Sequence, residues 1–136
     1  MISFNYETNF KLNDNEIISK WIGATILNEG FKKGDINYIF CDDTYLLKLN
    51  VEFLNHNTLT DIISFDYSIG KILHGDIYIS IERVKENAIK FGASFDKELN
   101  RVIIHGVLHY CGYKDKTEID IALMRKKENY YLNQLD

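Results

Sequence analysis

The stretch from residue 95 to residue 115 constrains the fold of this chain more than any other part of the sequence. Its spacing predicts a helix whose circumference is covered almost completely by apolar side chains: Leu99, Val102, Ile103, Val107, Leu108 and Tyr110. A helix that is apolar nearly all round is stable only when other elements bury it. We therefore expect this helix to be central, with the rest of the chain packed around it.

The same helix carries two histidines at a spacing that suits metal binding. His105 and His109 are four residues apart, so both rings lie on one face and can direct a ring nitrogen at one point. Gly112 can take the left-handed conformation that ends a helix, which lets the following chain fold back over that face. Asp115 then arrives as a third ligand. We predict a metal site formed by His105, His109 and Asp115.

Three protein ligands indicate a catalytic rather than a structural metal. Two nitrogens and one carboxylate oxygen leave one tetrahedral position open for water, as in catalytic zinc sites. Structural zinc sites usually contain cysteine, and neither Cys41 nor Cys111 belongs to a Cys-x-x-Cys pair. We therefore expect one Zn²⁺ per chain. The alternative is that the two histidines are ordinary core or surface residues, four apart by chance.

The residue after the first histidine limits the chemistry. The pattern His-x3-His-x2-Gly-x2-Asp is similar to the extended zincin signature of metalloproteases, but Gly106 replaces the glutamate that serves those enzymes as a base. A site without this base acts mainly as a Lewis acid. Phosphodiester cleavage is therefore favoured, and a peptidase whose base lies elsewhere in the chain is the alternative.

The metal-binding segment also resembles a known family. His105-Gly-Val-Leu-His109-Tyr-Cys-Gly112-Tyr113 is similar to the His-Gly-x-Leu-His-Leu-x-Gly-Tyr-Asp-His signature of the YbeY family of bacterial endoribonucleases. The similarity includes Thr60-Asp61-Ile-Ile-Ser64-Phe65, Gly75-Asp76-Ile77, Met124 and Glu128, and so covers nearly the whole chain. It implies a zinc-dependent, single-strand-specific endoribonuclease that acts in small-subunit (16S) rRNA maturation and ribosome biogenesis.

Two positions depart from the family pattern. The third ligand of the family is commonly histidine, whereas this chain has Asp115, preceded by Lys114 where an aspartate is usual. A carboxylate also binds zinc, so we still expect a metal, with altered affinity. The loop before Thr60 usually carries an arginine and a proline, and here has Leu54 and Leu59. Any role of that arginine therefore does not transfer to this chain.

Arg101 is the candidate catalytic side chain. It precedes His105 by one helical turn and shares the ligand face, where a guanidinium can hold a phosphate with two hydrogen bonds. The alternative is an ion pair that supports the site without touching substrate.

Five further residues are candidates for substrate binding. The resemblance implies that Thr60, Asp61 and Ser64 line the cleft, although such residues at strand ends also commonly serve turns. His56 lies in the polar loop near the family's arginine-bearing segment, where a histidine is more often simply solvated. Tyr113 can stack on a base, although packing is an equally common role for such a tyrosine.

The charge of the chain limits how it can attract nucleic acid. The net charge of −4 argues against binding through a broad basic surface. Arg101, Lys114 and Lys116 flank the proposed ligands, and a divalent cation adds positive charge at the same place. We expect single-stranded RNA, above all ribosomal RNA, as the substrate, and the resemblance implies the ribosomal small subunit or its assembly factors as partners. A non-catalytic assembly factor with a structural metal is a further alternative.

Length and hydropathy predict one cytoplasmic domain over residues 1–136. A chain of 136 residues is sufficient for one core, and no apolar run approaches the roughly 20 residues of a membrane span. The first residues lack a basic segment followed by an apolar one, so we expect no leader and no membrane association. Two cysteines far apart in the sequence fit a reducing compartment.

The order of elements predicts an α+β fold. Strand-like residues occur at 2–6, 36–41, 61–66 and 75–80, with a hairpin turn at 68–71. Helical patterns begin after a cap at Asn13, after Asp42, at Ile81, near Phe95 and after a cap at Thr117. We therefore expect about four strands in one mixed sheet, with roughly five helices packed on it.

Overall fold

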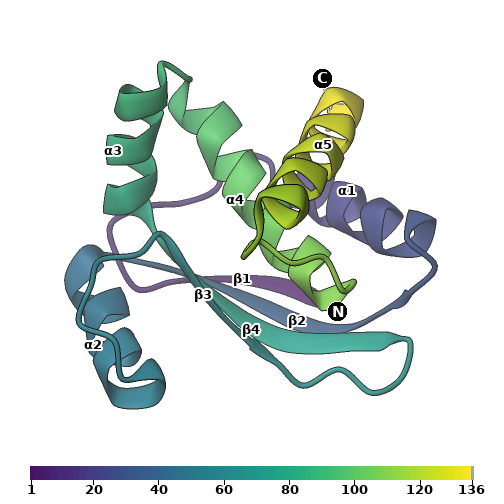
Figure 1. Cartoon of the computed structure of the whole chain (residues 1–136), viewed down its shortest axis with the longest axis horizontal. Coiled ribbons are helices and arrows are strands. Elements are labelled where there is room, and N and C mark those ends of the chain that lie inside the picture. Colours follow the sequence, from purple (N-terminus) through teal and green to yellow (C-terminus); the bar gives the residue numbers. More distant parts are fainter. Residues whose placement is uncertain (136) are drawn as a thin grey trace.

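Four strands and five helices make up residues 1–135, the part of the chain that this computed structural model describes (Figure 1). The strands are β1 (Ile2–Tyr6), β2 (Lys32–Cys41), β3 (Ile62–Asp66) and β4 (Ile72–Ser80). The helices are α1 (Asn15–Asn28), α2 (Asp43–Leu54), α3 (Ile81–Phe91), α4 (Phe95–Tyr110) and α5 (Glu118–Leu135). The predicted α+β class is confirmed.

The strands form one mixed sheet in the order β1-β2-β4-β3. β1 pairs with β2 and β2 pairs with β4 in parallel, whereas β3 and β4 form the predicted antiparallel hairpin, which turns at Gly70 with a φ of 58°. β2 begins at Lys32, earlier than its apolar residues predicted, because Lys32 and Lys33 pair with the start of β4 before a bulge. Strand order could not be predicted from the sequence.

The main core lies between one face of the sheet and the helices α1, α3, α4 and α5 (Figure 1). α4 crosses this face, and Ile103, Ile104, Val107 and Leu108 are completely buried. The hydroxyl of Tyr38 on β2 donates to the carbonyl of Ile103 at 2.8 Å, which ties the helix to the sheet. The expected central position of this helix is therefore confirmed.

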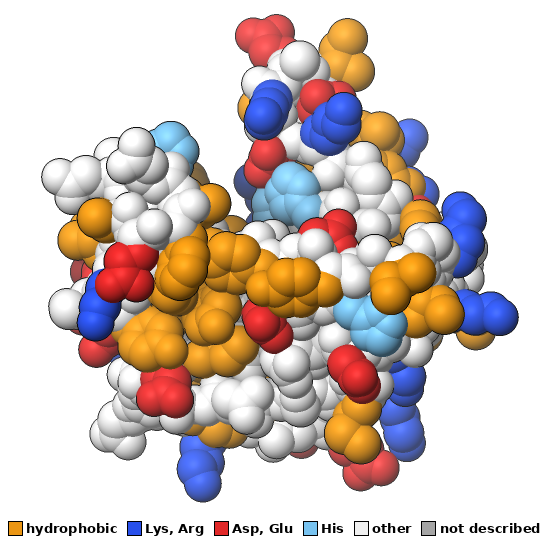
Figure 2. All heavy atoms as spheres, turned by 90° about the horizontal axis from the view of Figure 1, so that it is seen from below, with side chains coloured by type: hydrophobic (Ala, Val, Ile, Leu, Met, Phe, Trp, Pro, Cys, Tyr) orange, Lys and Arg blue, Asp and Glu red, His pale blue; other side chains and the backbone are white. Residues whose placement is uncertain are grey.

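α2 packs on the opposite face of the sheet, where a smaller cluster contains Cys41, Leu46 and Ile63. Tyr45 of α2 stacks on Tyr78, and Phe53 meets the edge of Phe65, yet these helix side chains remain partly exposed. Seen from below, hydrophobic side chains form a band across this side of the molecule (Figure 2).

Helix ends follow the sequence closely at three of the four sites where we predicted a cap or turn. The side chain of Asp42 accepts the backbone N–H of Tyr45 at the start of α2, and Thr117 accepts that of Asp120 at the start of α5. Gly112 takes a φ of 101° after α4, as predicted. The expected cap at Asn13 is wrong, since Asp14 precedes α1 and its side chain makes no capping hydrogen bond. Among residues 1–135, none of the helices combines the length and hydropathy needed to cross a bilayer.

Candidate metal centre

Two imidazole rings from α4 converge on one point. His105 and His109 lie one helical turn apart, and their Nε2 atoms are 3.0 Å from each other. The rings meet edge to face with centroids 4.5 Å apart, so the two nitrogens approach without stacking of the rings. Both side chains are partly exposed, and both line a cavity of about 490 Å³.

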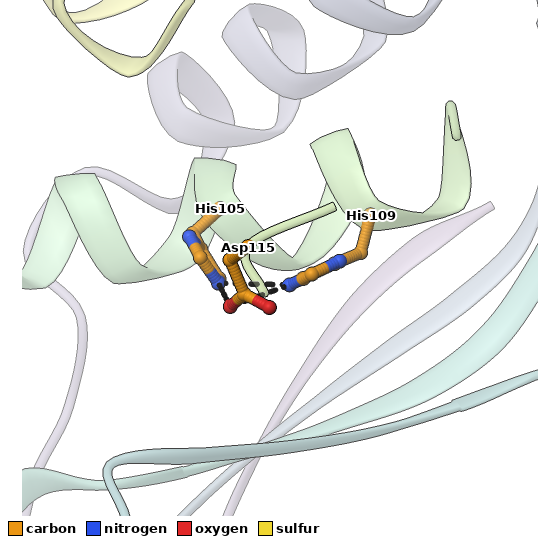
Figure 3. Close-up of side chains that lie close together, drawn as sticks. All are labelled: His105, His109 and Asp115. Carbon is orange, nitrogen blue, oxygen red and sulfur yellow. Dashed lines mark hydrogen bonds and ion pairs between the residues drawn. The ribbon is translucent and has the colours of Figure 1, made fainter. Parts of the chain in front are cut away.

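The turn after α4 brings a carboxylate to the same point. The N–H of Gly112 donates to the carbonyl of His109, and that of Tyr113 donates to the carbonyl of Leu108, which is the Schellman arrangement for ending a helix. The chain then folds back over the histidine face. Oδ2 of Asp115 lies 3.3 Å from Nε2 of His105 and 3.2 Å from Nε2 of His109 (Figure 3).

The three donor atoms fit a single cation. They form a nearly equilateral triangle with sides of 3.0, 3.2 and 3.3 Å. Ligands of a tetrahedral ion with bonds of about 2.0–2.1 Å are separated by about 3.3–3.4 Å, so the triangle has nearly the size of one tetrahedral face. No other group of three or more histidine, cysteine or acidic side chains among residues 1–135 converges in this way.

Glu128 of α5 orients the first histidine. Its Oε2 lies 2.7 Å from Nδ1 of His105, and because a carboxylate only accepts, Nδ1 carries the proton and Nε2 presents its lone pair to the other ligands. Burial lowers the pKa of His105, but the hydrogen bond and charge of Glu128 and the charge of Asp115 outweigh burial and raise it. Burial likewise raises the pKa of Glu128, but its partners His105 and Arg101 lower it overall.

Arg101 reaches the other oxygen of the same carboxylate. Its Nη1 donates to Oε1 of Glu128 at 3.0 Å, and the side chains of Arg101 and Glu128 are only 15% and 5% exposed. Arg125 lies 3.8 Å from the same oxygen. Arg101 also lines the cavity, so its guanidinium supports Glu128 and faces the space beside the ligands.

Three of the five predicted substrate-binding residues line this cavity. Thr60, Asp61 and Ser64 come from the start of β3 and the loop before it. Burial raises the pKa of Asp61, although the charge of His105 and hydrogen bonds from the backbone of Asp61 and Ile62 oppose this shift. The cavity therefore runs between the ligand face of α4 and the edge strand of the sheet.

The other two predicted substrate-binding residues lie elsewhere. His56 is exposed in the loop after α2 and is outside the residues that line the cavity. The hydroxyl of Tyr113 donates to Oε1 of Glu29 at 2.6 Å, and the same carboxylate accepts from Lys127 and Tyr131. Tyr113 thus ties the segment before Asp115 to the end of α1.

Glu128 is the site residue that we did not assign from the sequence. It matches a family position on the last helix, yet it is separated from His105 by 23 residues and no spacing rule links the two. One signal in the sequence could have pointed to Glu128: it follows Met124 by four residues and so lies on the same face of the last helix. In the structure this face is turned inward, and both side chains are buried.

Gly106 packs against the sheet instead of facing the cavity. A Cβ at this position would lie 3.0 Å from Cδ1 of Ile77 and 3.2 Å from Cδ1 of Ile62, which is tighter than ordinary contact. A glutamate at this position would therefore have to displace the strand side chains. The glutamate that serves the proteases as a base is thus absent at this position, and the packing here leaves no room for one.

The fold and the site define an α+β protein with a candidate metal centre of two histidines and one aspartate, open to a cavity. The family model described as "Endoribonuclease YbeY" matches residues 2–136. Proteins named "Endoribonuclease YbeY" from Flavobacterium psychrophilum and Flavobacterium johnsoniae are 60% and 58% identical to this chain. Each alignment covers 95% of this chain, with 92% and 93% of the respective relative. The chain belongs to the endoribonuclease YbeY family.

The solution structure of a Thermotoga maritima protein has a similar fold. It superposes with a TM-score of 0.71 at 25% sequence identity, and the match covers 99% of this chain and 89% of that protein. The arrangement of sheet and helices is therefore found in a protein with a very different sequence.

Proposed function

We propose that this chain is a zinc-dependent, single-strand-specific endoribonuclease in which His105, His109 and Asp115 hold one Zn²⁺. The observation that carries this proposal is the triangle of two nitrogens and one oxygen, with sides of 3.0 to 3.3 Å, on the wall of an open cavity. Two nitrogen ligands and one carboxylate are a donor set that suits zinc and leaves a fourth position free. The name of the relatives agrees with the endoribonuclease part of this proposal.

In this proposal, one set of residues holds the metal and another set contacts the RNA. A bound Zn²⁺ would supply Lewis acidity toward a phosphoryl oxygen and make a water molecule more acidic. Glu128 holds the proton of the neutral His105 ring on Nδ1, so that Nε2 faces the other two proposed ligand atoms. Arg101 holds Glu128 and offers its remaining N–H groups to a phosphate, while Thr60, Asp61 and Ser64 offer polar contacts on the opposite wall.

Local charge makes an RNA substrate compatible with an acidic chain. Arg101 and Arg125 line the cavity beside the ligands, and a divalent cation would add its charge there. We propose ribosomal RNA of the small subunit as the substrate, with the small subunit or its assembly factors as partners. The cytoplasmic location, the single functional domain over residues 1–136 and the substrate contacts of His56 and Tyr113 stay predictions.

The direct test of this function compares substrates. Protein purified with its metal is incubated with a labelled single-stranded RNA, the same RNA as a duplex, and an unfolded protein substrate. We expect internal cleavage of the single strand, little cleavage of the duplex and no peptide cleavage. Peptide cleavage without RNA cleavage would contradict the proposal and favour a metallopeptidase. If metal-loaded protein cleaves none of these substrates, the remaining alternative is a non-catalytic assembly factor with a structural metal.

Arg101→Ala is expected to leave metal content intact and to weaken RNA cleavage. The side chain contacts Glu128 and the cavity, whereas the metal ligands lie one turn and more along the helix. The logarithm of the RNA-binding constant falls linearly with the logarithm of the salt concentration. Loss of one phosphate contact should make this slope shallower by about one. Lys126→Ala, an exposed change on α5, is the matched control. Unchanged cleavage across a salt titration would reduce Arg101 to a partner of Glu128.

Asp115→Ala is expected to weaken zinc binding by more than the roughly 10–100-fold that loss of an outer hydrogen-bond partner costs. Asp115→His should retain zinc, because an imidazole supplies a ligand nitrogen at the same place. Lys116→Ala, an exposed neighbour, serves as the control. Isothermal titration of the stripped proteins with zinc measures all three. Equal affinity in the unmutated protein and both Asp115 variants would exclude Asp115 from the coordination sphere.

A further inference from the structure

Glu98 of α4 is a buried carboxylate without a protein partner. The residue is only 6% exposed, yet its carboxylate has no hydrogen bond or ion pair with any of residues 1–135. Within the same residues, every completely buried polar side-chain atom has a partner. The oxygens of Glu98 therefore keep some accessible surface, and the residue lines both the metal-binding cavity and a neighbouring one, where water or a bound molecule can reach them.

The carboxylate lies where two cavities meet. The metal-binding cavity and a second cavity of about 440 Å³ share four lining residues: Phe91, Glu98, Arg101 and Arg125. The second cavity continues past Lys97 to the turn between α3 and α4. Glu98 and His105 are seven residues apart on one helix, which corresponds to about 10 Å along the axis. A strand that stacks at about 3.4 Å per nucleotide would cover this distance in about three nucleotides.

The charges around Glu98 indicate which part of a nucleotide would face it. Arg101 and Arg125 on the shared wall, with Lys97 beyond it, suit phosphates. A carboxylate repels phosphate and requires a hydrogen-bond donor, which in RNA comes from the base edge or the ribose hydroxyl. Burial raises the pKa of Glu98, Arg101 and Arg125 lower it, and Asp61 and Glu128 raise it further. Because burial disfavours the ionised form, an incoming pair of N–H donors would stabilise it.

We propose that Glu98 forms a nucleobase subsite of the endoribonuclease and selects guanine within about three nucleotides of the cleaved bond. Guanine carries two adjacent donors, N1–H and the N2 amino group, on its Watson–Crick edge, and these match the two oxygens of a carboxylate. Adenine and cytosine place an acceptor nitrogen beside their single amino donor. Uracil places carbonyl oxygens on both sides of its single N–H. Each of these acceptors would face a carboxylate oxygen and repel it.

This subsite rests on the proposed RNA substrate, and Glu98→Gln tests it. Uridine oligonucleotides that contain one guanine, one adenine or one cytosine are bound to metal-loaded protein, with dissociation constants measured by fluorescence anisotropy. Cleavage positions on the same RNAs are mapped by gel. We expect the unmutated protein to prefer the guanine RNA by about tenfold, and to cut it at a fixed distance from the guanine.

The glutamine variant should change the preference instead of only weakening binding. Its side chain presents one acceptor and one donor, which suits adenine, so the preference should move from guanine toward adenine. Asp96→Asn makes the same chemical change on an exposed residue of the same helix and should keep the guanine preference. Equal metal content in both variants serves as the folding control.

Measuring RNA binding and RNA cleavage separately distinguishes failure of the guanine subsite from failure of the proposed nuclease activity. Absence of guanine preference in the binding of the unmutated protein, or its persistence in Glu98→Gln, would overturn the subsite even if RNA is cleaved. Guanine preference in binding without cleavage of any RNA would retain the subsite and overturn the nuclease activity.

Discussion

His105→Ala and His109→Ala are each expected to abolish stoichiometric metal binding and, with it, RNA cleavage. Either change leaves two of the three proposed ligand atoms, which now form a triangle with sides of 3.0 to 3.3 Å, and two ligands do not hold a zinc ion against dilution. The loss should exceed the roughly 10–100-fold effect of removing an outer partner. Metal content after gel filtration and cleavage of single-stranded RNA measure the two effects.

A third histidine provides the control for these variants. His74 lies on β4, where its Nδ1 accepts the backbone N–H of Asp35, and it is outside the residues that line the metal-binding cavity. His74→Ala should therefore keep one metal per chain. Retention of one tightly bound metal in His105→Ala or His109→Ala would contradict the ligand assignment.

Glu128→Ala should reduce both metal affinity and stability. The carboxylate accepts from Nδ1 of His105 at 2.7 Å and from Arg101 at 3.0 Å, and its side chain is only 5% exposed. Its removal releases the orientation of a metal ligand, which typically costs about 10–100-fold in affinity. It also leaves a mostly buried guanidinium without its partner, at a cost of about 3 kcal/mol of unfolding free energy. Zinc titration and chemical denaturation of the stripped protein measure these effects separately.

Two further variants locate the cause of this effect. Glu128→Gln keeps one acceptor oxygen and should lose less affinity and less stability than Glu128→Ala. Asn129→Ala, at the exposed neighbouring position on α5, should change neither. A Glu128→Ala protein with unchanged zinc affinity would show that the hydrogen bond to His105 does not orient the ligand.

The local features of the candidate metal centre could be predicted because neighbouring residues in the sequence determine them. The spacing of His105 and His109, the helix end at Gly112 and the cap at Thr117 each depend on a few consecutive residues. The burial of α4 followed from its nearly continuous apolar surface. These features turn the chain at Gly112 so that Asp115 comes back toward the histidines.

Contacts between distant elements could not be predicted in the same way. The pairing of Glu128 with His105 requires α5 to cross α4, and the hydrogen bond from Tyr113 to Glu29 requires the end of α1 to lie beside the turn after α4. Neither contact has a periodic pattern in the sequence. The unpartnered carboxylate of Glu98 is also invisible there, because at that level it is one more acidic residue in the first turn of a helix.

The central claim is that one metal, held by His105, His109 and Asp115, is required for cleavage of single-stranded RNA. The most direct measurement determines the metal content of the purified protein by mass spectrometry. It then compares RNA cleavage by the native, chelator-stripped and zinc-reloaded protein. Our account predicts one zinc per chain, loss of cleavage on stripping and recovery on reloading. Full cleavage by stripped protein that retains no metal would contradict it.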